Sequence, residues 1–368
     1  MSLPAVARIR SAALQKNLDR ARAAAPGEPV LAIIKADAYG HGLEHVIKGL
    51  DSADAFGVAR VGEALRLREL QVRHPIVVMS EDVGADEMES AREHSLSLVI
   101  HSEAQIELLA RGSHGPLPGI WLKIDSGMGR LGLAHERLGW ALQRLRNCSA
   151  VTGEPVLMTH LASADETDNP ATGEQLRLFG AAIGTWDGEV SIANSAGILG
   201  WPEALSSGAQ LRYTGRNWLR PGLMLYGVSP FPGQAPGDVG LEPVMTLQAR
   251  LIDVRQLAAG SRVGYGGDWE AARDSRIGVV NIGYADGYPW RIPGGTPVTL
   301  ADGKASVVGR ISMDMISIDL TDLPNAKVGD AVTLWGESPH VGDLAAAAGT
   351  SPYELLTGVG NRVERMLV

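Results

Sequence analysis

Short apolar runs alternate with longer segments of helical periodicity between residues 29 and 227. The alternation is typical of strand–helix units, and the nearly continuous apolar character of each run indicates parallel strands buried on both faces. Eight units in about 200 residues favour an α/β fold with a (β/α)8 TIM-type barrel over an open doubly wound sheet. The predicted strands are Val30–Ile34, Ala55–Val58, Ile76–Met79, Leu96–Ile100, Ile120–Ile124, Val156–His160, Val190–Ala193 and Leu219–Tyr226.

A proline- and glycine-rich segment separates this pattern from a different one. Residues 229–240 read SPFPGQAPGDVG, and after them strand-like runs follow one another with little helical spacing, except for one probable helix near residues 341–349. We therefore predict a barrel over residues 1–235 and a β-rich C-terminal domain over residues 236–368. The first ten or so residues are candidates to pair with the second domain.

Composition excludes several classes of partner. The 368 residues carry 33 Lys and Arg against 42 Asp and Glu, a net charge of -9 without a basic run, which argues against nucleic acid. The apolar runs stay below the roughly 18 residues of a membrane-spanning helix, so we expect no membrane partner. Cys148 is the single cysteine, and the N-terminus has two arginines where a signal peptide needs apolar residues. We expect a cytoplasmic protein.

Lys35 stands where the first apolar run ends. In a barrel it would project at the C-terminal mouth, where active sites are built. A partly desolvated amine there has a lowered pKa and can form a Schiff base with a carbonyl substrate or with pyridoxal phosphate. Taken alone, however, a lysine at a strand end is usually a surface residue with a buried stem.

Two motifs suggest other cofactors, but weakly. Residues 127–132, GMGRLG, match a dinucleotide-binding glycine pattern, although Asp125 and Ser126 separate them from the preceding strand. His41 and His45 have the spacing of two metal ligands on one helical face, yet no third ligand accompanies them. We therefore assign no metal.

Two further residues have open interpretations. His160 ends a predicted strand and would face the barrel mouth, either as a satisfied core histidine or as a functional one. Tyr265 lies among glycines and by itself indicates a turn. A phenol is a poor base at neutral pH unless neighbouring donors or cations stabilise its anion.

Eight segments carry a more specific signal when they are taken together. They are residues 32–42 (AIIKADAYGHG), 123–132 (KIDSGMGRLG), 158–166 (MTHLASADE), 193–197 (ANSAG), 220–227 (RPGLMLYG), 262–269 (RVGYGGDW), 282–288 (IGYADGY) and 309–315 (GRISMDM). Together they resemble bacterial alanine racemase over both predicted domains, so a one-domain pyridoxal-phosphate barrel protein fits less well. The resemblance implies a homodimer whose active sites each borrow residues from the partner, and a role in supplying D-alanine for peptidoglycan precursors.

The resemblance also implies how the cofactor, pyridoxal 5'-phosphate, is held. Lys35 matches the Schiff-base lysine, and Arg220 matches the arginine that faces the pyridine nitrogen. A guanidinium there disfavours a proton on that nitrogen and makes the ring a weaker electron sink, which should limit transamination. The positions that match phosphate-binding residues are Tyr39, Ser195, Gly222 and Leu223.

Racemisation needs two acid/base groups on opposite faces of a planar intermediate. By the resemblance, Lys35 serves the D-isomer and Tyr265 of the other subunit serves the L-isomer, with His160 and Arg220 assisting the phenol. Arg130 and the Met313 backbone match groups that bind the substrate carboxylate. The remaining matches are Lys123, a lysine often carbamylated in the family, and Tyr284 and Asp314, which line the substrate entrance.

One departure and several alternatives remain at this point. Asn361 stands where some members carry a phosphate-binding tyrosine. The motifs leave open a racemase of similar construction that acts on serine, lysine or a broad set of amino acids. A cofactor-holding protein without activity is disfavoured by the presence of both Lys35 and Tyr265, and a dinucleotide oxidoreductase rests on the glycine pattern alone.

Overall fold

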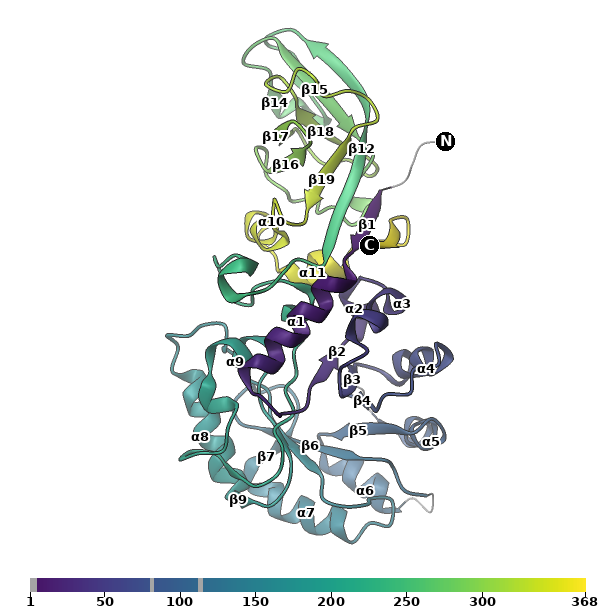
Figure 1. Ribbon diagram of the computed structural model, residues 1–368, viewed down its shortest axis with the longest axis vertical. Helices are drawn as coiled ribbons and strands as arrows, with labels where there is room; N and C mark the ends of the chain where they lie inside the picture. The colour runs from purple at the N-terminus through teal and green to yellow at the C-terminus, as the bar shows by residue number, and fades with distance from the viewer. Residues whose placement is uncertain (1–4, 80–82, 112–114) are drawn as a thin grey trace.

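A ring of parallel strands forms the lower half of the molecule (Figure 1), as the alternating pattern predicts. The structure is a computed structural model that describes residues 5–79, 83–111 and 115–368. Seven strands lie side by side in the order β10-β8-β6-β5-β4-β3-β2. Residues 217–221 close the ring as an eighth, because Val30 bridges to Leu219 and Val190 bridges to Asn217. The seven strands are β2 (Leu31–Ile33), β3 (Ala55–Val58), β4 (Ile76–Val78), β5 (Leu96–Ile100), β6 (Ile120–Asp125), β8 (Val156–Met158) and β10 (Val190–Ser191).

The eighth strand prediction is partly wrong. Only its first residues are extended, and Leu223–Tyr226 form a 3₁₀ helix, η4. The physical cause is Ser195, whose hydroxyl oxygen accepts hydrogen bonds from the amides of Gly222 (2.9 Å) and Met224 (3.2 Å) and so turns the chain out of the sheet. The apolar run is buried as expected, but in a helical turn.

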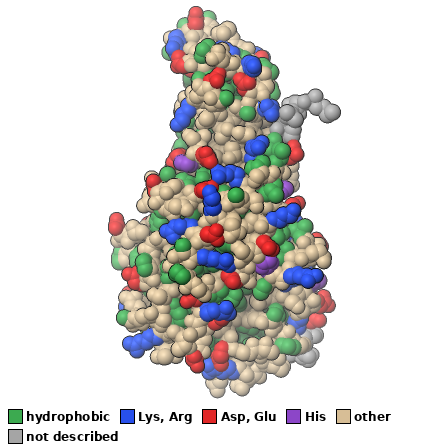
Figure 2. Space-filling model, in the orientation of Figure 1, with side chains coloured by type: hydrophobic (Ala, Val, Ile, Leu, Met, Phe, Trp, Pro, Cys, Tyr) green, Lys and Arg blue, Asp and Glu red, His purple; other side chains and the backbone are tan. Residues whose placement is uncertain are grey.

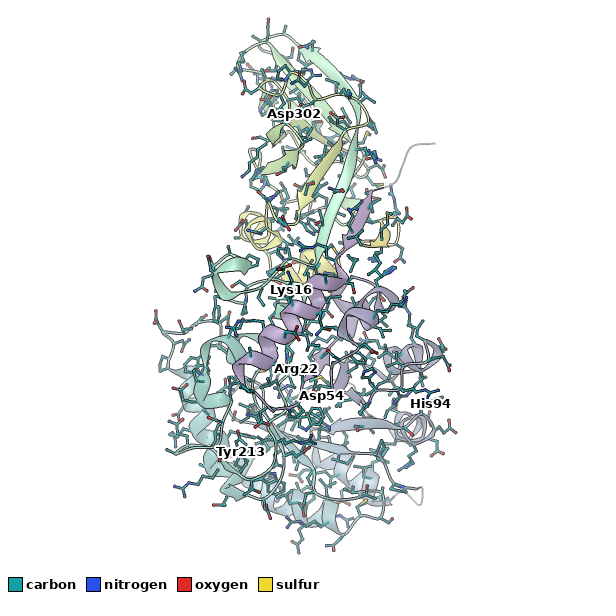
Figure 3. The ribbon with its side chains drawn as sticks, in the orientation of Figure 1. Lys16, Arg22, Asp54, His94, Tyr213 and Asp302 are labelled. Carbon is teal, nitrogen blue, oxygen red and sulfur yellow. The ribbon has the colours of Figure 1, made fainter. Side chains whose placement is uncertain are left out.

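Helices surround the barrel and connect its strands (Figure 1). Each buries an apolar face; α8, for example, buries Leu176, Phe179 and Ile183. In Figure 3, Arg22 at the end of α1 lies beside Asp54, and their 3.1 Å ion pair ties α1 to the residue preceding β3. The helices are α1 (Ser11–Ala24), α2 (Lys35–Tyr39), α3 (Leu43–Val46), α4 (Val61–Glu69), α5 (Ala85–Glu93), α6 (Glu103–Arg111), α7 (Leu138–Arg146), α8 (Ala171–Ile183) and α9 (Ser195–Gly200). The short strands β7 (Leu133–Ala134), β9 (Thr185–Trp186) and β11 (Arg212–Tyr213) lie outside the ring.

The upper part of the molecule is a largely antiparallel sheet that closes on itself, because β12 pairs with both β19 and β15. The N-terminal strand β1 belongs to this sheet, where it lies between β12 and β20. Helices α10 and α11 pack where the sheet meets the barrel (Figure 1). The elements are β1 (Val6–Ile9), β12 (Met245–Leu257), β13 (Arg262–Val263), β14 (Trp269–Glu270), β15 (Ser275–Val280), β16 (Pro297–Leu300), β17 (Gly303–Val308), β18 (Ile316–Asp319), β19 (Ala331–Trp335), α10 (Val341–Ala348), α11 (Pro352–Thr357) and β20 (Glu364–Leu367).

One apolar core continues from the barrel into the upper sheet. On the face in Figure 2, Lys and Arg side chains are interspersed with Asp and Glu. Within the described ranges, no helix has both the length and the apolar character that crossing a bilayer requires.

Two glycines of α8 test how closely the barrel elements pack. A Cβ at Gly180 would overlap the carbonyl oxygen of Gln210, whereas one at Gly173 would meet no atom within 4 Å. We expect Gly180→Ala to lower the free energy of unfolding by about 2 kcal/mol through overpacking, and Gly173→Ala to raise it by up to about 1 kcal/mol through helix propensity. Urea unfolding of both variants measures the free energy of unfolding. Similar changes for the two substitutions would contradict the expected close packing at Gly180.

Candidate active site

Basic side chains gather at the C-terminal mouth of the barrel. Burial lowers the pKa of Lys35, and the charge of Arg130 lowers it further, against a weaker opposing effect of Glu63. Burial lowers the pKa of Lys123 to about 8, with further lowering by Arg220 and Arg130. Such mutual pKa depression shows that these cations share one small volume, so the mouth is suited to an anionic ligand.

Arg220 lies at the centre of this group and is 2 % exposed. Its guanidinium donates to Ser191 Oγ at 2.6 Å and to the carbonyls of Thr159 (2.6 Å) and Ile192 (3.1 Å). Burial lowers its pKa to about 9, which leaves it protonated at neutral pH. Its Nε atom is buried without a hydrogen-bond partner among the described residues. A buried donor of this kind calls for an acceptor from a ligand.

His160 contacts Arg220, with 3.5 Å between its Nδ1 and a guanidinium nitrogen. Burial, followed by the charge of Arg220, lowers the pKa of His160 well below its usual value. The imidazole is therefore neutral in this mouth, where it can share a proton with a neighbouring group but adds no further positive charge.

The chain leaves Lys35 in a left-handed helical turn. Ala36, Asp37, Ala38 and Tyr39 all have φ between 51° and 55°. Each such residue costs about 1–2 kcal/mol relative to the right-handed form, so surrounding contacts must hold the turn. Within it, Ala36 N–H donates to Glu63 Oε1 at 2.7 Å.

A cradle of small groups lies beside this turn. The Tyr39 hydroxyl approaches Gly222 so closely that a Cβ there would lie 2.5 Å from it, and the Tyr39 ring stacks on Tyr226 with centroids 4.6 Å apart. The Ser195 hydroxyl bonds the amides on either side of Leu223, whose own N–H finds no acceptor within the described part of the chain. Hydroxyls and a free amide at the starts of α9 and η4 fit a phosphate.

The glycine motif has a structural explanation. The Asp125 carboxylate accepts hydrogen bonds from the amides of Gly127, Met128 and Gly129, all between 2.9 and 3.1 Å. The amides that would cradle a dinucleotide are thus used within the loop. The loop instead presents Arg130, which is exposed and has no ion pair among the residues described.

The second-domain candidates form a separate group in one chain. Tyr284 and Met313 are brought together by hydrogen bonds from the amides of Tyr284 and Ala285 to Ser312 and Met313. Tyr265 is 69 % exposed and lies between β13 and β14. Strand β14 is in the upper part of the molecule, far from the barrel (Figure 1). The structure therefore does not bring Tyr265 together with Lys35 in a single chain.

Sequence reasoning missed two side chains near these sites. Arg362 pairs with Asp314 at 2.8 Å and with the buried Asp286 at 3.1 Å, which fixes one side of the expected substrate entrance. The Tyr353 ring lies 5.8 Å from that of Tyr39, and its pKa is raised to about 12 by burial and then by Asp165. The only sequence signal was the start of a helix at Pro352.

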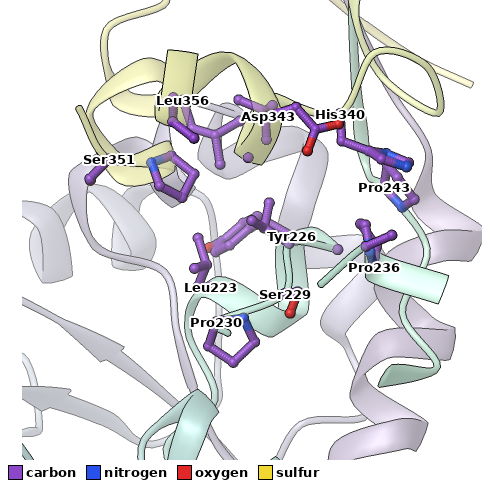
Figure 4. Close-up of a pocket in the computed structure, with 18 of the residues that line it drawn as sticks. Leu223, Tyr226, Ser229, Pro230, Pro236, Pro243, His340, Asp343, Ser351 and Leu356 are labelled. Carbon is purple, nitrogen blue, oxygen red and sulfur yellow. The ribbon is translucent and has the colours of Figure 1, made fainter. Parts of the chain in front are cut away.

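Tyr353 is thus a second tyrosine, besides Tyr226, that contacts the cradle residue Tyr39. Asn361, the position suspected of replacing such a tyrosine, is exposed in the turn before β20. A cavity of about 350 Å³ opens beside Tyr353, between α11 and residues 228–236, the linker to the second domain. Leu223 and Tyr226 lie on its wall (Figure 4).

Comparison with known proteins gives a consistent result. The family described as "Alanine racemase, N-terminal domain" matches residues 9–230, and "Alanine racemase, C-terminal domain" matches residues 244–367. An alanine racemase of Pseudomonas taetrolens is 45% identical over 364 residues, 98% of each chain. The biosynthetic alanine racemase of Pseudomonas aeruginosa has a similar structure, with a TM-score of 0.91, 42% identity and 99% of each chain covered. An alanine racemase of Bartonella henselae with covalently bound pyridoxal phosphate gives a TM-score of 0.85 at 27% identity, covering 100% of each chain.

The lowered pKa of Lys123 makes stability depend on pH. Between pH 8 and about 10.4 the unfolded chain keeps a proton on this amine that the folded chain has lost, so the free energy of unfolding rises with pH. We expect the advantage of Lys123→Met over the wild type to shrink by about 2 kcal/mol from pH 8 to 9.5. Urea unfolding of cofactor-free protein in CO2-free buffers measures it. Lys48→Met, at an exposed position, is the control, and a pH-independent difference for Lys123→Met would contradict the expectation.

Proposed function

The chain belongs to the alanine racemase family and racemises alanine, and from this premise we propose that it does so with pyridoxal 5'-phosphate and two acid/base groups from two chains. The observation that carries the proposal is the unpartnered Nε of Arg220 in a mouth of buried cations. In support, a similar structure from Bartonella henselae holds covalently bound pyridoxal phosphate.

The residues present fit this cofactor. Lys35 would carry it, the unpartnered Arg220 Nε–H would donate to its ring nitrogen, and the cradle would take its phosphate. When bound, the cofactor supplies an electron-withdrawing ring that stabilises the negative charge left on the substrate Cα after proton loss. Because the Arg220 guanidinium keeps its own proton and positive charge at neutral pH, it would disfavour a proton on the ring nitrogen and so limit transamination. The proposed phosphate ligands are Tyr39, Ser195, Gly222 and Leu223.

Lys35 and Tyr265 would move the Cα proton on opposite faces of the substrate. Burial lowers the pKa of Lys35, so a larger fraction of its amine is unprotonated than in an exposed lysine. We assign the D-isomer to Lys35 and the L-isomer to Tyr265 of the partner chain, which His160 and Arg220 of this barrel would assist.

The substrate carboxylate would be held by Arg130 and by the Met313 backbone, as a guanidinium fork suits a carboxylate. Lys123, with its pKa near 8, has a neutral fraction that can react with CO2. Carbamylation would convert a cation among cations into an anion that orients Arg130. Tyr284 and Asp314 would narrow the entrance, which favours a small side chain such as that of alanine.

A homodimer would complete each site. Large side chains are exposed on the second domain, among them Tyr265 (69 %), Trp290 (58 %) and Met313 (52 %). Such exposure suits a surface that covers a partner. We propose that residues 236–368 of one chain reach the barrel, residues 1–235, of the other, and that the enzyme supplies D-alanine for peptidoglycan precursors in the cytoplasm.

Borohydride reduction tests the cofactor assignment. We expect reduction of the holoenzyme, followed by peptide mapping, to place the pyridoxyl label on Lys35, because its amine has the lowered pKa and stands at the strand end. Lys123 lies in the same mouth and is the internal control. Label on Lys123, or no label, would refute the assignment.

Mixed dimers test whether the two acid/base groups come from different chains. Lys35→Ala and Tyr265→Phe should each be inactive alone, while random mixing should restore about a quarter of wild-type activity, since half the dimers then hold one complete site. Wild type mixed with the double variant should form inactive heterodimers. If both groups came from one chain, the first mixture would stay inactive and the second would keep the activity of its wild-type chains.

A further inference from the structure

The left-handed turn after Lys35 is held from outside the barrel. Gly40 ends the turn, and a Cβ at this position would overlap the carbonyl oxygen of Leu356 in α11. The backbone of the turn therefore lies directly against the second domain of the same chain. Its φ of 77° also favours glycine, so two independent constraints act at one residue.

Arg365 of β20 also binds the backbone of Gly40. Its Nε donates to the Gly40 carbonyl at 2.8 Å, while its other nitrogens donate to the carbonyls of Val359 (2.7 Å), Val363 (3.2 Å) and Gly360 (3.3 Å). All four partners are main-chain carbonyls, so the guanidinium acts as a rigid connector between the turn and the C-terminal segment. Its stem also passes Gly42, where a Cβ would lie 3.3 Å from Arg365 Cδ.

The opposite side of the turn is packed by aromatic rings. His41 lies 4.6 Å from Tyr226, and its Nδ1 is 2.9 Å from the Tyr39 carbonyl. The Tyr226 hydroxyl donates to the Ile33 carbonyl at 3.0 Å. This side belongs to the barrel itself, so the strained turn is clamped between its own barrel and the second domain.

A cavity lies beside the contacts that hold the turn. The cavity in Figure 4 separates the linker from α10 and α11, so the two domains are not packed solidly there. Loss of the grip on Gly40 would leave four residues with positive φ free to relax toward ordinary backbone conformations. Such relaxation would move Lys35 and Tyr39, which begin and end α2.

We propose that Arg365 is a positioning residue for the reaction, which fixes Lys35 and Tyr39 of its own barrel through the carbonyl of Gly40. The proposal rests on the function assigned to Lys35 above. The second domain would then position residues in the active site of its own chain, in addition to supplying Tyr265 to the active site of the partner.

Arg365→Ala is compared with Arg68→Ala as a matched control. Arg68 also donates to four main-chain carbonyls, of Val72, His74, His94 and Ser95, but these lie at the start of β4 and β5, away from the turn. Hydrogen exchange of the cofactor-free proteins is followed by mass spectrometry in peptides that cover residues 35–43. We expect exchange there to be at least about tenfold faster in Arg365→Ala and unchanged in Arg68→Ala.

The second readout is binding of pyridoxal phosphate, followed by its visible absorption. We expect the apparent Kd to rise at least about tenfold in Arg365→Ala, with kcat for alanine lowered and KM little changed, because Arg130 is untouched. Arg365→Lys keeps the charge but reaches fewer carbonyls and should fall between the two, and it replaces Arg365→Ala if that variant does not fold.

The proposal would be overturned if Arg365→Ala and Arg68→Ala lowered Tm equally and had the same hydrogen exchange and the same cofactor affinity. Arg365 would then contribute only to general stability. The proposed function fails separately, if the wild type itself does not place pyridoxal phosphate on Lys35. Exchange of the cofactor-free turn does not depend on that outcome.

Discussion

Buried positive charge at the barrel mouth is the constraint around which the site is arranged. Desolvating a cation without a counter-charge costs several kcal/mol, and Arg220 offsets this through two carbonyls, one hydroxyl and the His160 ring. The nearby carboxylates are already engaged: Asp125 with three amides of its loop, and Glu63 with the amides of Ala36 and Ala59. These carboxylates offset part of the positive charge, since Glu63 raises the pKa of Lys35 and Asp125 raises that of Lys123, and an anionic ligand would offset more of it. The phosphate and carboxylate ends of such a ligand would meet different members of the group.

The barrel was predictable because parallel strands buried on both faces need continuous apolar residues, a signal that survives without tertiary information. The prediction of the eighth strand was partly wrong because Leu223–Tyr226 is as apolar as the residues of the other strands. This segment forms a helical turn through the hydroxyl of Ser195, which is 27 residues away from Gly222 in the sequence. Strand β20 was harder to predict. The residues of β20 are mostly exposed, so the sequence shows no alternation of apolar and polar residues there. The strand pairs with β1, which lies at the other end of the chain.

The site divides in the same way. Lys35 and His160 could be placed at the mouth because strand ends in a barrel converge at one edge, whereas Lys123 and Arg220 were singled out only by the family resemblance. The conformation of the turn after Lys35 could not be predicted, since three of its residues with positive φ are alanine or aspartate, which prefer other conformations. The roles of three residues could not be predicted because each contacts a residue more than 45 positions away in the sequence. These residues are Tyr353, Arg362 and Arg365. Arg365 and Gly40, for example, are 325 positions apart.

The lowered pKa of Lys35 and the left-handed turn that follows it impose different structural requirements on residues 35–39. A catalytic amine with a lowered pKa needs desolvation, which requires that its backbone be held tightly against apolar neighbours. The left-handed turn achieves this by folding Tyr39 back onto Tyr226 within five residues of Lys35, but it is not stable alone. A second domain that grips the turn at Gly40 from outside leaves the mouth open to ligands, whereas a bulkier loop inside the barrel would fill it. The two-domain architecture thus keeps the amine buried, the backbone strained and the mouth accessible at once.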